Sequence, residues 1–222
     1  MNFMRFQTQS GSRDCFPACF CNAMHYFGIE ITPALRNRLD AFTCGMESCT
    51  IHENEERLER YERSIHKFMA EWAWAQRCRE NAEGMYTKPE TWARGLLEKG
   101  IALELRNGPI EQQSLLMAGL SRGSVVLCEV WVLPPDIPDS ESRHFILIIK
   151  AKSGALLAHD PLLIHSGMRF GSDAIRHGTD ECGANFEIAC EYFFSEQTGP
   201  LKPKPNPYQT GYGYKFMLVA RR

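Results

Sequence analysis

The stretch QSGSRDCFPACFCNAMHYFG, residues 9–28, passes from a polar turn containing glycine straight into an apolar segment. From Cys15 onward, apolar residues recur at close to helical spacing, and Gly28 is a typical residue at a helix end. The pattern therefore predicts a helix that begins at Cys15. A helix N-terminus favours the thiolate form of a cysteine, so Cys15 is a candidate nucleophile if the chain supplies a base.

The overall composition is typical of a soluble globular protein. The chain has 222 residues, of which 44% are hydrophobic and 23% charged, and this length fits one large domain. A net charge of -2 gives no indication of nucleic acid or an anionic membrane as a partner. Neither a secretory signal nor an apolar run of about 18 residues is recognisable, so we expect a cytoplasmic protein without membrane insertion. Export by a signal-independent route stays open.

Nine cysteines are many for this length, and the number is odd. We expect most of them to be reduced and buried as small apolar side chains. Cys44, Cys49 and His52 form the pattern C-x4-C-x2-H, but a structural zinc site usually has a closely spaced cysteine pair on each side. The sequence therefore predicts no metal site and no cofactor.

Three further helical patterns follow the first one. In residues 31–39, Thr32 is a suitable N-cap and Pro33 a suitable first helical residue. Residues 54–81 form a long charged pattern, and residues 87–100 form a shorter one. The long pattern has an apolar stripe at helical spacing, made of Leu58, Tyr61, Ile65, Phe68 or Met69, and Trp72. We expect the stripe to pack on the domain, the charges to face water, and Trp72, Trp74 and Trp92 to lie in the core.

Strand patterns dominate the second half of the chain. They cover residues 101–106, 124–133, 143–151 and 155–161, with a last strand near the C-terminus after a proline-rich loop at 199–213. MNFMRF, at the start, could be one more short strand. Helices that precede strands in this way are typical of an α+β fold, here with an N-terminal helical part packed on an antiparallel sheet.

His144 and Asp160 lie at the two ends of a predicted hairpin. The strands HFILIIK and ALLAHDP flank the polar turn KSG, which we place near Lys152–Ser153. Because paired strands lie about 5 Å apart, His144 would come close to the region of Asp160. A carboxylate beside an imidazole fixes its tautomer and stabilises the imidazolium, which is the arrangement of a catalytic dyad.

A nucleophile, a base and a carboxylate together predict acyl transfer. Cys15 would attack, His144 would move the proton and Asp160 would orient the ring. Gln9, six residues before Cys15, could donate a hydrogen bond to the oxyanion together with the backbone N–H of the nucleophile. His159 is an alternative base, although strand alternation points it away from the side of Asp160, and Asn185 is an alternative orienting residue.

These motifs, taken in order, resemble a known family. The stretch QSGSRDCFPAC, then HFILII, then HDP is similar to the papain-like cysteine peptidases that process bacteriocin leaders at a double glycine, and to their stand-alone relatives. The segment TWARGLLEKGIALELR and the terminal YKFMLVARR are similar to a helix–strand pair and the last strand of that family. The resemblance implies a single papain-like domain over residues 1–222, with a helical insertion at about 41–84. It also implies that Gln9, Cys15, His144 and Asp160 hydrolyse a peptide bond in a peptide or protein substrate.

Two departures from the family pattern concern the site. Phe16 replaces the glycine that usually follows the nucleophile, and Arg143 replaces the small residue before the histidine. Bulk at either position could narrow the substrate cleft. Two alternatives to a peptidase therefore stay open: a cysteine acyltransferase that uses the same residues, and a binding module of the same fold with an inactive site. The oligomeric state is not indicated.

Overall fold

The computed structural model describes the chain in nine stretches. These are residues 6, 14–47, 54–80, 92–108, 113–132, 142–161, 174–177, 181–195 and 214–222. The predicted strand at residues 1–6 has only Phe6 among the described residues, and Phe6 is in no regular element. The proline-rich loop at 199–213 and the first residues of the predicted helix at 87–100 lie outside the described residues.

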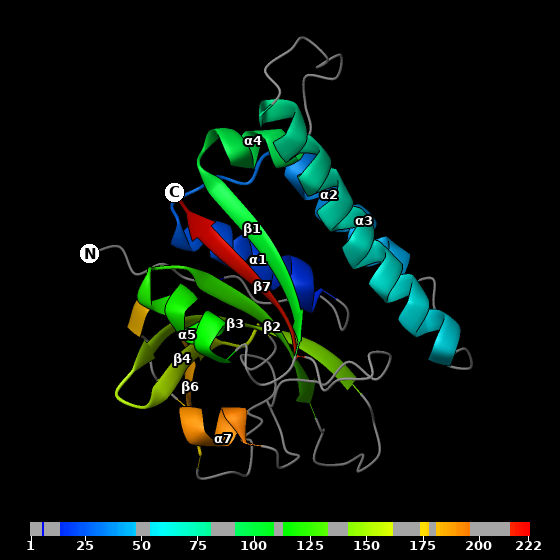
Figure 1. The fold of residues 1–222 in the computed structure, drawn as a ribbon. Helices are drawn as coiled ribbons and strands as arrows, with labels where there is room; N and C mark the ends of the chain where they lie inside the picture. Colours follow the sequence, from blue (N-terminus) through cyan, green and yellow to red (C-terminus); the bar gives the residue numbers. More distant parts are fainter. Residues whose placement is uncertain are drawn as a thin grey trace.

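Helices form most of the first half of the described chain and strands most of the second (Figure 1). The helices are α1 (Cys15–Tyr26), α2 (Pro33–Glu47), α3 (Asn54–Glu80), α4 (Trp92–Glu98), α5 (Gln113–Ser121) and α7 (Cys190–Phe194), with the 3-10 turn η2 (Glu181–Gly183). The strands are β1 (Ile101–Gly108), β2 (Val125–Val132), β3 (Ser142–Lys152), β4 (Ala155–His159), β5 (Ile175–His177), β6 (Phe186–Ala189) and β7 (Tyr214–Arg221).

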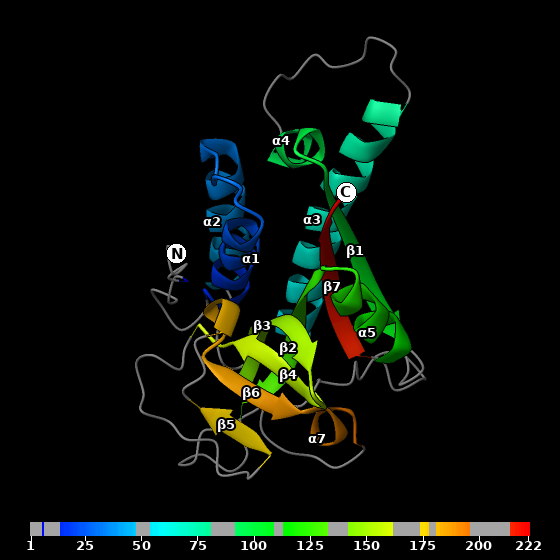
Figure 2. The ribbon, with the colours of Figure 1, turned by 90° about the vertical axis from the view of Figure 1, so that its left-hand side faces the viewer.

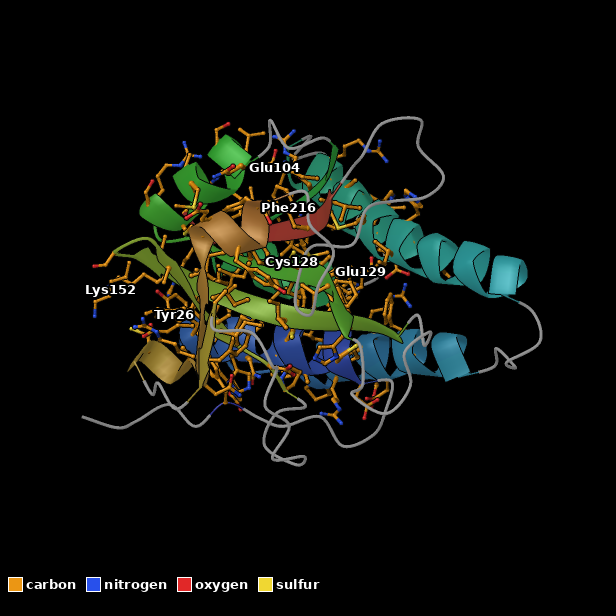
Figure 3. The ribbon with its side chains drawn as sticks, turned by 90° about the horizontal axis from the view of Figure 1, so that it is seen from below. Tyr26, Glu104, Cys128, Glu129, Lys152 and Phe216 are labelled. Carbon is orange, nitrogen blue, oxygen red and sulfur yellow. The ribbon has the colours of Figure 1, made fainter. Side chains whose placement is uncertain are left out.

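The strands form one seven-stranded sheet in the order β1-β7-β2-β3-β4-β6-β5, and its neighbours pair antiparallel. The predicted α+β class with an antiparallel sheet is thus confirmed. Helices cover both faces, since the sheet lies between α1 on one side and α5 and α7 on the other (Figure 3). The helices α5 and α7 and the strands β5 and β6 were not predicted from the sequence.

Alternation along the strands divides the core into two clusters. Leu127 and Leu147 belong to the cluster with α1–α4, whereas Cys128 and Phe216, paired across β2 and β7, belong to the cluster with α5 and α7 (Figure 3). Successive residues of a strand point to opposite faces, so both faces of the central strands are apolar. The sheet is therefore held from both sides.

Helix α1 begins and ends as the sequence predicts. Cys15 is its first residue, and the N–H of Ala18 donates to the carbonyl of Asp14 at 2.8 Å. At the other end, Gly28 has a left-handed φ of 66°, the Ile29 N–H bonds to the Met24 carbonyl, and the Gly28 N–H bonds to the His25 carbonyl. This is a Schellman motif, which a glycine permits without a steric penalty.

Helices α2 and α3 run side by side away from the sheet (Figures 1 and 2). Thr32 caps α2 as predicted, because its hydroxyl accepts from the N–H of Leu35 at 3.2 Å, but the helix continues to Glu47. The stripe of α3 is buried where it is described, at Ile65, Phe68 and Trp72. Trp72 and Trp92 lie in the core as expected, whereas the prediction for Trp74 is wrong because 42% of it is exposed. No described helix is both long and apolar enough to cross a membrane.

Candidate active site

The β3–β4 hairpin carries two of the candidate site residues. Lys152 pairs with Ala155, so the turn consists of Ser153 and Gly154, one residue later than the turn expected from the sequence. Both turn residues have positive φ values, 50° and 80°, as a two-residue type I′ turn requires. Such a turn matches the twist of the strands and joins them tightly.

A β-bulge between Ile148 and Lys150 decides which side chains of the hairpin meet. Beyond the bulge, Leu147 pairs with His159, so Asp160 follows opposite Ile146 and diagonal to His144 on the same face. Without the extra residue, the register of the turn would place Asp160 opposite Leu147, on the other face from His144. A shift of one residue inverts every side chain of a strand, so the bulge is what brings the pair together.

His144 and Asp160 form a buried hydrogen bond. The His144 Nε2–H donates to Asp160 Oδ1 at 2.7 Å, and the two residues are only 5% and 1% exposed. Asp160 is the first residue after β4, so its side chain leaves the sheet at the strand end. A short charge-assisted hydrogen bond of this kind holds the imidazole in one orientation.

Cys15 contacts the other side of this imidazole. It lies close enough to His144 for its charge and hydrogen bonding to raise the pKa of the imidazole, and because Nε2 is used by Asp160, Nδ1 is the ring nitrogen left for the sulfur. One turn later, the Cys19 thiol donates to the carbonyl of Phe145 at 3.3 Å, which ties α1 to β3 beside His144. Helix α1, β3 and the end of β4 thus bring Cys15, His144 and Asp160 together.

The protonation of His144 sets the charge of the group formed by Cys15, His144 and Asp160. Burial by itself lowers the pKa of His144, but the charge and hydrogen bond of Asp160, together with the hydrogen bond and charge of Cys15, raise that pKa from 6.5 to about 10. The imidazole therefore holds a proton at neutral pH, between a carboxylate and a sulfur. The proton can be delivered from Nδ1 to a group that reacts at the sulfur.

The cysteines whose side chains are described are free thiols. Burial, followed by the charges of Cys15 and Asp160, raises the pKa of Cys19 well above its usual value. Burial likewise raises the pKa of Cys21 and of Cys128. These three thiols stay protonated and contribute apolar packing, as expected for most of the cysteines.

The alternatives considered from the sequence have other contacts. His159 Nδ1–H donates to the carbonyl of Gly183 at 3.1 Å, and the ring of Phe6 packs edge-on against it, with centroids 5.0 Å apart. Asn185 bonds to the backbone of Asp160 instead of to His144. Neither residue takes the place assigned to it as an alternative base or orienting group.

Phe16 does not narrow a cleft. Its side chain is 1% exposed and packs against Phe42, Phe68 and Phe145, with ring centroids 4.6, 5.7 and 5.2 Å away. The ring therefore points into the core between α1, the two long helices and β3. The side chain of Arg143 lies outside the described part of the structure.

Gln9, the candidate oxyanion donor, also lies outside the described residues, so its role stays a prediction. Cys49 and His52 lie outside them as well. Among the residues that the structure describes, no three His, Cys, Asp or Glu side chains gather as metal ligands. Two features of the site were missed from the sequence, the bulge in β3 and the contact of Asn185. An asparagine just before a strand is a weak signal for such a contact.

Comparison with known proteins finds no match: no protein-family model, no curated protein and no solved structure matches the chain.

Proposed function

We propose that the protein is a cysteine-dependent enzyme of acyl transfer, and that within this class it is a peptidase with a papain-like arrangement. The observation that carries the proposal is the buried His144–Asp160 hydrogen bond next to Cys15, which is the first residue of α1. The resemblance of QSGSRDCFPAC, HFILII and HDP to papain-like peptidases supports the same residue roles.

The reaction follows from the positions of the three groups. The Cys15 sulfur attacks the carbonyl carbon of a peptide bond and forms a C–S bond, while the oxygen takes up the negative charge. His144 gives its Nδ1 proton to the nitrogen of the leaving amine, the C–N bond breaks and a thioester remains. His144 then removes a proton from water, which attacks the thioester and releases the acid and Cys15. Asp160 keeps the ring oriented through both steps.

The oxyanion needs donors aimed at it. The backbone N–H of Cys15 is not used within the helix, because the first four N–H groups of a helix have no intrahelical partner. Gln9 is the proposed side-chain donor. Loss of one such donor typically costs about 10²–10³ in turnover, so Gln9→Ala should lower turnover by this factor while Cys15 stays reactive.

A selective alkylation experiment tests the nucleophile. Cys15 is 4% exposed, whereas Cys182 is exposed, so accessibility alone would make Cys182 react first. With limiting iodoacetamide at pH 6, we expect peptide-level mass spectrometry to find Cys15 modified before Cys182. His144→Ala should remove this preference, because the thiolate loses its counter-ion. Cys15 inert even at pH 8, with Cys182 modified, would overturn the assignment.

An acyltransferase is the second candidate, and the burial of the site favours it. Cys15, His144 and Asp160 are all at most 5% exposed, which limits the water available for hydrolysis of a thioester. An amine or thiol could then accept the acyl group. Product analysis by mass spectrometry, with and without an added amine, distinguishes the two, because only an acyltransferase gives mainly the amide.

A further inference from the structure

The backbone of Asp160 lies just beyond the sheet. Strand β4 ends at His159, and the last pair that it forms with β6 joins Ala158 to Phe186. The next residue, Pro161, has no backbone N–H. Asp160 thus lies two residues past the last pair of β4 with β6, while its carboxylate accepts a hydrogen bond from His144 Nε2.

Asn185, the residue just before β6, holds this backbone. Its Oδ1 accepts from the Asp160 N–H at 2.9 Å, and its Nδ2 donates to the Asp160 carbonyl at 2.8 Å. Its own backbone N–H donates to the Ala158 carbonyl at 3.0 Å. The side-chain amide thus takes the place of a peptide group and extends the β4–β6 ladder past the strand end.

We propose that Asn185 is a positioning residue for the reaction, which acts by fixing the backbone of Asp160 and through it the ring of His144. The inference rests on the proposed function. It assigns Asn185 a task different from that of an orienting group in direct contact with the imidazole, because within the described part of the chain its amide bonds to the backbone of Asp160.

The chemistry of the contact selects asparagine. The Asp160 backbone offers one donor and one acceptor, and a planar side-chain amide can form hydrogen bonds with both at once. Aspartate would keep the acceptor, lose the donor and direct a negative charge at the Asp160 carbonyl. Alanine would leave both backbone groups without this partner, and the peptide could then rotate and carry the carboxylate away from His144.

The charge of His144 reports whether the carboxylate stays in place. The titratable groups that act on the ring are Asp160, after the end of β4, and Cys15 on α1. Cys19 lies one turn further along α1, and Glu129 on β2 pairs with Phe145. Of these, Asp160 makes the largest favourable contribution to the imidazolium. If its carboxylate moves away, the pKa of His144 falls from about 10 toward 6.5.

The test compares Asn185→Ala with Thr32→Ala in the full chain. Thr32→Ala also removes a bond from a side chain to a backbone N–H, but at the start of α2 and away from the site. The His144 signal in the NMR spectrum, identified by its loss in His144→Ala, is titrated with pH, and kcat and KM are measured on a fluorogenic peptide library. Both variants should lose thermal stability.

For Asn185→Ala we expect a His144 titration at least one pH unit lower than in the wild type. We also expect kcat to fall about tenfold to a hundredfold at similar KM, as for groups that orient metal-binding histidines. Thr32→Ala should leave both readouts unchanged. Asn185→Asp should lower kcat at least as much as Asn185→Ala. Asn185→Ser keeps one donor and one acceptor, so its kcat and its His144 titration should lie between those of the wild type and Asn185→Ala. It replaces Asn185→Ala in the test if that variant does not fold.

Two failures are distinguishable. If the wild type labels at Cys15 and turns over peptide, but the Asn185 variants keep the titration and kcat of Thr32→Ala, then Asn185 is only structural and the inference is overturned. If the wild type shows neither selective labelling of Cys15 nor turnover, the proposed function is wrong and the role of Asn185 in it is wrong too.

Discussion

Two regions contact helix α1 at consecutive residues, and they do so by opposite means. The β3–β4 hairpin meets Cys15 through hydrogen bonds among a few buried polar groups, whereas α2 and α3 meet Phe16 through aromatic rings. A buried polar group needs a partner in one geometry, while an apolar contact depends mainly on filled volume. The hairpin is therefore expected to govern reactivity, and the two helices to govern stability.

Cys15→Ala should give the largest effect. If the proposed function holds, turnover should fall by roughly 10⁴–10⁶-fold, because removal of the proposed nucleophile would disable the whole catalytic unit. The free energy of unfolding should change far less than the activity, since alanine is compatible with a helix start. Steady-state assays and urea unfolding measure the two quantities. Activity within tenfold of the wild type would show that the hairpin does not govern reactivity through Cys15.

Phe16→Ala should have its main effect on stability. The variant loses the contacts with Phe42, Phe68 and Phe145 and leaves a cavity, so the free energy of unfolding should fall by about 3–5 kcal/mol. Urea unfolding by circular dichroism measures it, and Leu115→Ala, at a site 39% exposed on α5, is the control with an expected change within about 0.5 kcal/mol. A loss below 1 kcal/mol for Phe16→Ala would contradict the assignment of stability to the aromatic side.

The buried His144–Asp160 pair of the β3–β4 hairpin should also make the free energy of unfolding depend on pH. The pKa of His144 is raised in the folded protein from 6.5 to about 10, so between these values the folded state binds the extra proton. The stabilisation is complete below about pH 6.5 and is lost as pH rises through about 10. Urea unfolding across pH 6–10 measures this slope, which Asp160→Asn should reduce. An equal slope in the two proteins would show that the pair does not stabilise the fold.

The smallest effect on stability is expected for Glu71 on α3, at the partly exposed edge of the aromatic contacts. Glu71 Oε2 accepts from Trp92 Nε1–H at 2.7 Å and pairs with Arg38 at 2.9 Å, but 38% of the Glu71 side chain is exposed. Glu71→Gln keeps an acceptor for Trp92 and removes the charge, so thermal unfolding should show a loss of about 1 kcal/mol or less, with unchanged turnover. A turnover reduced tenfold would show that the helices also act on the site.

Much of this comparison could be anticipated from local sequence. The start of α1, its end at Gly28, the Thr32 cap and the strands of the hairpin all follow from residues within one or two turns of each other. Helix α5 was missed because nine residues rich in apolar side chains do not distinguish a helix from a strand by periodicity. The three-residue β5 and four-residue β6 are too short to give an alternation.

The sequence by itself determined that a thiol opens a helix and that His144 and Asp160 lie at the ends of one hairpin, because helix caps, tight turns and strand propensity are local properties. Only the tertiary structure decided that the two residues share a face, that Asn185 holds the Asp160 backbone and that Phe16 points into the core. A single bulged residue inverts the faces of a strand, and its position is selected by packing on both sides of the sheet. That choice involves contacts between segments far apart in the chain, which a local pattern does not contain.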